Sequence, residues 1–156
     1  MQPKVYLETT VLSYLTGRPS RDLVTAAHQQ LTRDWWEERA SFDLYVSQVV
    51  VQEAAGGDSG AASARLQVLE GIEVLEVTSE ARDLAEQLLS GGAVPEKAAV
   101  DAMHISIAVV NGMDYLVTWN CAHIGNATMR HTIEGVCRAA GYDPPVICTP
   151  EELMEE

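Results

Sequence analysis

The segment 95–120, PEKAAVDAMHISIAVVNGMDYLVTWN, constrains the fold more than any other part of the chain. It predicts a helix that is apolar on nearly all sides, a stop at Gly112 and a short strand over residues 115–118, followed by Asn120. A helix with this pattern belongs in a protein interior. The helix also carries an acid, Asp101, which therefore requires an explanation from other parts of the chain.

The rest of the sequence alternates short apolar runs with segments of helical spacing. The expected strands are residues 5–7, 43–46, 72–77, 115–118 and 146–148. The expected helices cover about residues 11–15, 21–39, 48–55, 61–70, 79–89, 99–111 and 127–140. This alternation predicts βαβ units, and hence an α/β fold with a parallel sheet covered by helices on both faces.

Local signals mark where several helices begin. Either Thr9 or Thr10 is expected to cap the first helix, and Ser47 the helix after the second strand. Near the end of the chain, Thr149 followed by Pro150, with a glutamate at position 152, predicts the start of a further helix.

Length and composition indicate a single folded domain over residues 1–156. The chain has a mass of 17.0 kDa and 47% hydrophobic residues, enough for a sizeable core. There is no apolar run of membrane-spanning length and no signal-peptide core, so we expect a soluble cytoplasmic protein without a membrane partner. The three cysteines form no C-x-x-C pair, which favours reduced thiols.

The charge balance bears on possible nucleic-acid binding. Ten basic residues stand against 23 acidic ones, which gives a formal net charge of −13. A uniformly basic nucleic-acid binder would look different, yet a local basic patch is compatible with this total. The bulk charge therefore weakens a nucleic-acid interpretation without refuting it.

Four polar residues from separate segments are expected to meet at one edge of the sheet. Glu8 and Asn120 follow strands directly, and the carboxyl ends of parallel strands are where such sheets bind ligands. Glu53 lies on the helix after another strand, and Asp101 on the helix before the strand that leads to Asn120. Their convergence is a hypothesis about the fold.

Three carboxylates in one cleft repel one another and lose hydration, so they must take up protons, pair with bases or bind cations. Mg²⁺ is held in proteins by one or two carboxylates together with waters and substrate phosphates. A site of this kind activates water and supports in-line displacement at phosphorus. Asn120 could add a neutral oxygen ligand or orient a water.

Simpler interpretations apply to each of these residues. Lys97, Asp101, His104 and Asn111 share one helical face, which is compatible with a solvated stripe and a Lys97–Asp101 pair.

Glu53 could equally be a solvated acid near the end of its helix, and Asn120 an ordinary turn residue. A zinc site from Cys121 and His123 with His104 or Cys137 lacks the usual ligand spacing. His104 could also support Asp101 or pack in the core.

Three stretches, VYLETTVLSYL, VVVQEAAGGD and VDAMHISIAVVNGMDYLVTWN, carry a family resemblance. In this order they resemble the PIN-domain family and, within it, the VapC-like toxins of toxin–antitoxin pairs. The resemblance implies a three-layer α/β/α sandwich around a parallel sheet. It also implies Mg²⁺- or Mn²⁺-dependent endoribonuclease activity on an RNA substrate, a homodimer and a cognate antitoxin.

The same resemblance assigns roles to individual residues. Glu8 stands where the family usually has its first aspartate, Glu53 matches the second acid and Asp101 the third. Asn120 stands where many members have a fourth aspartate, and Thr118 matches a hydroxyl residue that often supports the site.

Thr9 and His104 complete the expected supporting residues. We therefore expect Glu8, Glu53 and Asp101 to hold the cation, with Asn120 as an auxiliary catalytic residue.

Two departures from the family pattern define the alternative function. Glu8 carries one methylene more than an aspartate, and Asn120 lacks a charge, which weakens binding of a second metal. A catalytically weak or inert module that binds RNA or a partner is therefore the competing hypothesis. A receiver-like or phosphatase-like protein would need an acceptor aspartate after the first strand, where this chain has Glu8.

Overall fold

A five-stranded sheet forms the centre of the computed structural model, which describes residues 1–155. All neighbouring strands run parallel, in the order β3-β2-β1-β4-β5. The strands are β1 (Lys4–Leu7), β2 (Asp43–Ser47), β3 (Glu73–Leu75), β4 (Tyr115–Val117) and β5 (Val146–Cys148). The predicted parallel sheet is confirmed.

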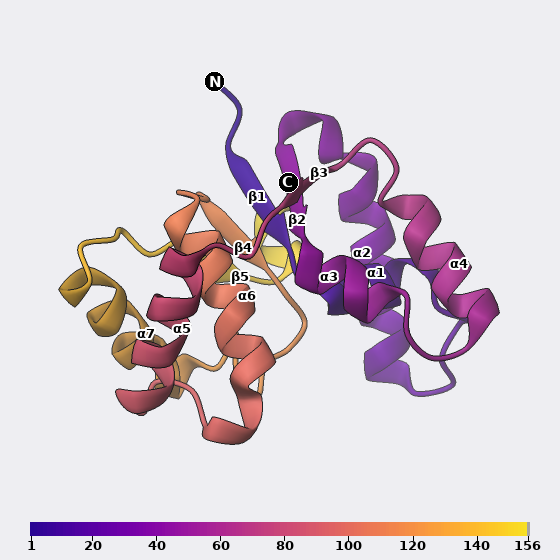
Figure 1. The fold of residues 1–156 in the computed structure, drawn as a ribbon. Helices are drawn as coiled ribbons and strands as arrows, with labels where there is room; N and C mark the ends of the chain where they lie inside the picture. Colours follow the sequence, from indigo (N-terminus) through magenta and orange to yellow (C-terminus); the bar gives the residue numbers. More distant parts are fainter. Residues whose placement is uncertain (156) are drawn as a thin grey trace.

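Helices cover both faces of this sheet. They are α1 (Thr9–Thr16), α2 (Leu23–Glu37), α3 (Gln48–Ala54), α4 (Ser59–Val68), α5 (Ser79–Ser90), α6 (Ala99–Val110) and α7 (Ala127–Ala139). Short 3₁₀ turns cover Arg39–Ser41, Glu96–Ala98 and Pro150–Leu153. Helices α1 to α4 lie on one side of the sheet and α5 to α7 on the other (Figure 1). The predicted three-layer α/β/α arrangement is therefore confirmed.

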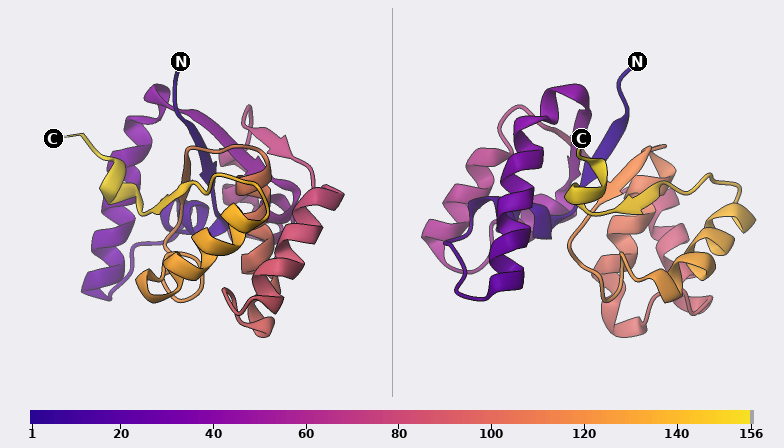
Figure 2. Two further views of the ribbon diagram at one scale, coloured as in Figure 1. Left: turned by 90° about the vertical axis from the view of Figure 1, so that its left-hand side faces the viewer. Right: turned by 180° about the vertical axis from the view of Figure 1, so that it is seen from behind.

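The chain changes direction across the sheet at β1. From β1 it passes outward through β2 to the edge strand β3, and it then returns to pair β4 with the other side of β1. Figure 2 shows α5 and α6, which connect β3 to β4, together with α7 on the side of the sheet away from α1 to α4. A crevice at the carboxyl ends of two strands where the order reverses is the usual ligand site of such sheets. Here that position lies between β1 and β4.

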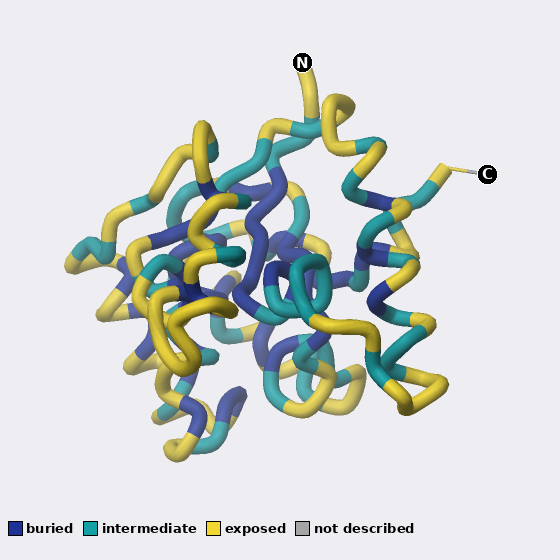
Figure 3. Tube along the Cα trace, turned by 90° about the vertical axis from the view of Figure 1, so that its right-hand side faces the viewer, coloured by how far each residue is buried: buried dark blue, intermediate teal, exposed yellow. Residues whose placement is uncertain are grey.

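The core consists of the two central strands and the inner sides of the helices. Val5, Tyr6 and Leu7 of β1 are completely buried, as are Leu116 and Val117 of β4. Figure 3 shows this buried centre with exposed turns around it. A central parallel strand is covered on both faces, so its residues need not alternate between apolar and polar.

Helix α6 is buried along most of its length, as its sequence predicts. Its buried residues include Ala102, Ile105 and Ile107. It ends at Val110, and Gly112 just after the cap has a positive φ of 68°, a conformation that glycine adopts without steric cost. No helix in the described part of the chain is long and apolar enough to cross a bilayer.

Local predictions near the ends of elements need three corrections. The cap of α1 is Glu8, because its side chain folds back to accept the Thr10 N–H, and neither threonine takes this role. Strand β3 is shorter than expected, because it pairs with β2 alone over three residues. Thr149 caps no backbone N–H, and its hydroxyl instead faces the Glu152 carboxylate at 3.4 Å beside a short 3₁₀ turn.

Candidate metal centre

Glu8 lies directly after β1, at the point where the strand order reverses. Its Oε1 accepts hydrogen bonds from the Thr10 and Thr118 hydroxyls, and its Oε2 accepts the Thr10 N–H at 3.1 Å. The residue is only 3% exposed. Three donors compensate the lost hydration of the carboxylate. No lysine or arginine of residues 1–155 forms an ion pair with it.

Glu53 reaches the same edge from α3. Its Oε1 accepts the Thr9 hydroxyl at 2.7 Å and lies 2.5 Å from Nε2 of His104. The hydrogen bond from His104 lowers the pKa of Glu53, partial burial opposes this shift, and the Thr9 hydroxyl adds to it. With 40% of its side chain exposed, Glu53 remains accessible from solvent.

His104 is completely buried behind Glu53. Its Nδ1 lies 2.7 Å from the Tyr6 hydroxyl, which in turn lies 2.8 Å from Oγ of Ser47. Ser47 caps α3 and accepts the Val50 N–H. Burial raises the pKa of Tyr6, so its hydroxyl keeps its proton.

Glu8, Glu53 and His104 each place one potential ligand atom within 4.8 Å of the other two. Among residues 1–155 this is the one group of three or more acidic, histidine or cysteine side chains with that geometry. Carboxylate oxygens suit Mg²⁺ and Mn²⁺, whereas imidazole nitrogen suits transition metals. The donor set therefore fits a divalent cation. It contains no cysteine and so does not correspond to the zinc alternative.

Asp101 is not a member of this group. It lies in the first turn of α6, and its Oδ2 is 3.1 Å from Nδ1 of His123. The Lys97–Asp101 pair of the simpler interpretation is not formed among residues 1–155. A link of four residues joins the end of α6 to the start of β4, so the first turn of α6 lies toward the carboxyl end of the sheet. Asp101 thus reaches the right edge but contacts a different partner.

Asn120 lies in the turn after β4, and its side chain stabilises that turn. Its Oδ1 accepts the His123 N–H at 3.1 Å, and its own N–H is bonded to the Thr118 hydroxyl at 2.9 Å. His123 thus links Asn120 to Asp101. The Thr118 hydroxyl links Asn120 to Glu8 in the same way.

Four residues hold these groups in place in roles that the sequence did not indicate: Tyr6, Thr10, Ser47 and His123. Thr10 was considered only as a helix cap and His123 only as a zinc ligand. Tyr6 was hidden in an apolar run, and Ser47 was recognised only as a helix cap. Thr10 stands two residues after Glu8, a spacing typical of a side chain that bonds its own backbone, and this signal could have been used. His123 carries no such signal, since its partner Asp101 is 22 residues away.

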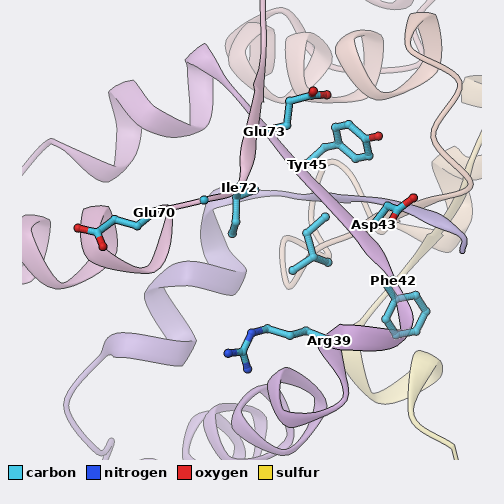
Figure 4. A pocket seen from close by; sticks show the side chains of 9 residues that line it. Arg39, Phe42, Asp43, Tyr45, Glu70, Ile72 and Glu73 are labelled. Carbon is cyan, nitrogen blue, oxygen red and sulfur yellow. The ribbon is translucent and has the colours of Figure 1, made fainter.

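A separate hollow of about 590 Å³ lies at the other end of the sheet, near the starts of β2 and β3. Arg39, Asp43, Glu70 and Glu73 are among its lining residues, and the carboxylates of Glu70 and Glu73 point in different directions (Figure 4). None of the expected site residues lines this hollow. The acids around it therefore do not compete with Glu8 and Glu53 as a metal centre.

The fold and this site together define a class: α/β proteins with a cluster of acidic side chains at the reversal point of a parallel sheet. The model of the PIN domain family matches residues 5–120, and the chain belongs to this family. The matched segment includes Glu8, Glu53, Asp101 and Asn120.

Solved structures with a similar fold include VapBC2 and VapC20. VapBC2 from Rickettsia felis, crystallised with a DNA fragment from its promoter, has a TM-score of 0.55 and 16% identity, covering 75% of this chain and 88% of that one. VapC20 from Mycobacterium tuberculosis, described as a toxin that cleaves the sarcin–ricin loop, has a TM-score of 0.54 and 17% identity. It covers 88% of this chain and 95% of that one. No curated protein matches the chain significantly.

Proposed function

We propose that this protein is a metal-dependent endoribonuclease and acts as the VapC-like toxin of a toxin–antitoxin pair. The observation that carries the proposal is the meeting of Glu8 and Glu53 within 4.8 Å at the reversal point of a PIN-family sheet. The solved structures with this fold support it, because one of them is described as a toxin that cleaves the sarcin–ricin loop.

In this proposal Glu8 and Glu53 bind the cation, and Asp101 completes the carboxylate set. Mg²⁺ or Mn²⁺ bound there supplies stabilisation of developing negative charge and activation of water at a phosphodiester. Thr10 and Thr118 hold the Glu8 carboxylate in place through their hydroxyls. Asp101 reaches the cation when His123 moves, or through a water between them, since its present partner is His123.

Asn120 contributes less to the site than a carboxylate would. Its amide oxygen already accepts a backbone N–H, so in this proposal it orients water or RNA through its remaining hydrogen-bonding groups. The net charge of −13 makes divalent cations important for the approach of RNA as well.

The test is cleavage of RNA in the presence of Mn²⁺, comparing the wild type with Asp101→Asn. We expect the wild type to cleave, a chelator to abolish cleavage, and Asp101→Asn to lose at least about 100-fold, the usual cost of removing a group that contacts the reacting centre. The matched control is Asp83→Asn on the exposed face of α5, which should cleave like the wild type. Equal activity of Asp101→Asn and the wild type would refute the assignment.

The partners follow from the same proposal. We expect a homodimer, a cognate antitoxin and a cytoplasmic location. VapBC2, whose crystals contain promoter DNA, supports the expectation of an antitoxin. Light scattering of the purified chain tests the dimer, and identification of the proteins that co-purify with the tagged chain from its own host tests the antitoxin.

A second candidate is an inert module that binds RNA without cutting it. Two observations favour it: Glu8 already accepts three hydrogen bonds, and the Asn120 amide oxygen is occupied by its turn. Calorimetry with Mg²⁺ and Mn²⁺ separates the two functions. Absence of binding at millimolar concentration would favour the inert module.

A further inference from the structure

We propose that His104 is a positioning residue, and that the buried chain Ser47–Tyr6–His104 directs its Nε2–H at Oε1 of Glu53 so that Oε2 is left for the cation. The inference rests on the proposed function, since it concerns the same metal centre. In this arrangement His104 does not itself bind the metal.

The direction of the hydrogen bonds follows from the inventory of donors. An ionised Glu53 can only accept, so Nε2 of His104 must donate across the 2.5 Å contact. Nδ1 of a neutral ring then accepts, and the Tyr6 hydroxyl at 2.7 Å is its donor. Tyr6 in turn accepts from Ser47, whose oxygen also accepts the Val50 N–H. Every proton in the chain then has an acceptor.

The other protonation states of His104 leave buried groups without partners. A ring protonated at Nδ1 alone would set two acceptors, Nε2 and Oε1 of Glu53, against each other. A doubly protonated ring would force Tyr6 to donate to Ser47, and no hydrogen bond among residues 1–155 would then take the Ser47 proton. Leaving a buried polar group unpaired is unfavourable, so the neutral Nε2–H form is favoured.

The two carboxylate oxygens of Glu53 differ in their hydrogen bonds. Oε1 accepts both Thr9 and His104, whereas no hydrogen bond within residues 1–155 involves Oε2. Two donors on one oxygen fix the rotation of the carboxylate. Groups that hold a metal ligand in this way set its orientation and basicity. Oε2 is consequently the Glu53 atom available to a cation.

The first test is the tautomer of His104, read from the ¹⁵N shifts of its ring in two-bond ¹H–¹⁵N spectra. We expect the Nε2–H form in the metal-free protein and also in the protein saturated with Mg²⁺. An Nδ1–H form, or a shift of Nε2 to the value of a metal-coordinated nitrogen, would overturn the proposal and make His104 a ligand. The metal-free spectrum alone decides the direction of the hydrogen bonds.

The second test is Mn²⁺ affinity by calorimetry. His104→Leu should bind Mn²⁺ about 10–100-fold more weakly, the range typical for outer-shell partners of metal ligands. His104→Gln should recover part of this loss, because its amide N–H can still donate to Glu53. His131→Leu, at an exposed position of α7, is the control and should bind like the wild type.

Tyr6→Phe provides a variant that preserves shape if His104→Leu fails to fold. It removes the donor to Nδ1 and the acceptor of the Ser47 hydroxyl proton, so the ring is held by Glu53 alone. Glu53 still selects the Nε2–H tautomer, but Mn²⁺ should bind several-fold more weakly. Unchanged Mn²⁺ affinity in Tyr6→Phe would overturn the proposal. Failure of the wild type to bind any divalent cation would instead refute the proposed function, because the tautomer is measured without metal.

Discussion

Thr118 donates its hydroxyl proton to Oε1 of Glu8 across 2.6 Å, and this hydrogen bond joins the ends of β4 and β1. The two residues are 110 positions apart in the chain. The same hydroxyl oxygen accepts the Asn120 N–H, so a single side chain connects the buried acid to the turn after β4. The metal centre is thus built on the pairing of the two central strands.

The Thr118 hydroxyl should therefore contribute measurably to stability. Thr118→Val removes one donor from a buried carboxylate and one acceptor from a backbone N–H, at a cost of about 1–3 kcal/mol in the free energy of unfolding. Urea denaturation measures the change. Thr132→Val at an exposed position of α7 is the control, with an expected change within about 0.5 kcal/mol. Equal stability of the two variants would contradict the structural role of Thr118.

Asn120→Asp should restore a fourth acid without disturbing the turn. The new carboxylate can still accept the His123 N–H, and it adds a negative charge next to the proposed centre. We expect calorimetry to show Mn²⁺ binding several-fold more tightly. Gln87→Glu adds the same charge on exposed α5 and should leave the affinity unchanged. Weaker Mn²⁺ binding by Asn120→Asp would indicate that residue 120 only stabilises the turn and does not contribute to the metal centre.

The three cysteines should differ sharply in reactivity. Cys121 is exposed, whereas burial raises the pKa of Cys137 to about 11 and that of Cys148 to about 12. Because the thiolate is the reactive form, a thiol reagent at pH 8 should label one site quickly in the native protein and three after denaturation. Cys121→Ser should abolish the fast phase. Rapid labelling of three native thiols would contradict the structure.

Asp22 should make the start of α2 sensitive to acid. The backbone N–H of Thr25, and then its hydroxyl, lower the pKa of Asp22 below its ordinary value of 3.8. Because the folded-state pKa is the lower one, the contribution of Asp22 to stability is complete above pH 3.8 and is lost as the pH falls through the folded value. An NMR titration of the Asp22 carboxyl checks the direction. A pKa at or above 3.8 would contradict the capping interaction.

The layered fold could be predicted from the sequence because its causes are local and periodic. Apolar runs at residues 5–7 and 115–118, separated by helical segments, require a parallel sheet. That topology then places Glu8 and residue 118 at the same edge. The all-round apolar pattern of α6 likewise indicated its burial.

The contacts inside the site could not be predicted in the same way. Helical spacing places Asp101 and His104 on one face of α6, but it does not show which neighbour each side chain meets. His104 contacts Glu53 and Tyr6, whereas Asp101 contacts His123 in the turn after β4. The partner that each side chain contacts depends on how three segments pack together. The pattern within a single segment does not indicate it. The Glu8 side chain, which caps α1, is a second example.

The position of Mn²⁺ in crystals of the wild-type protein, located by its anomalous scattering, tests the metal centre directly. A cation held by both acids should give a peak within about 2.5 Å of a carboxylate oxygen of Glu8 and of Glu53, the range of metal–oxygen distances in such sites. The same experiment on Glu53→Gln should show a weakened peak. A peak at another group of acids, or none at millimolar Mn²⁺, would contradict the assignment of this edge of the sheet as the metal centre.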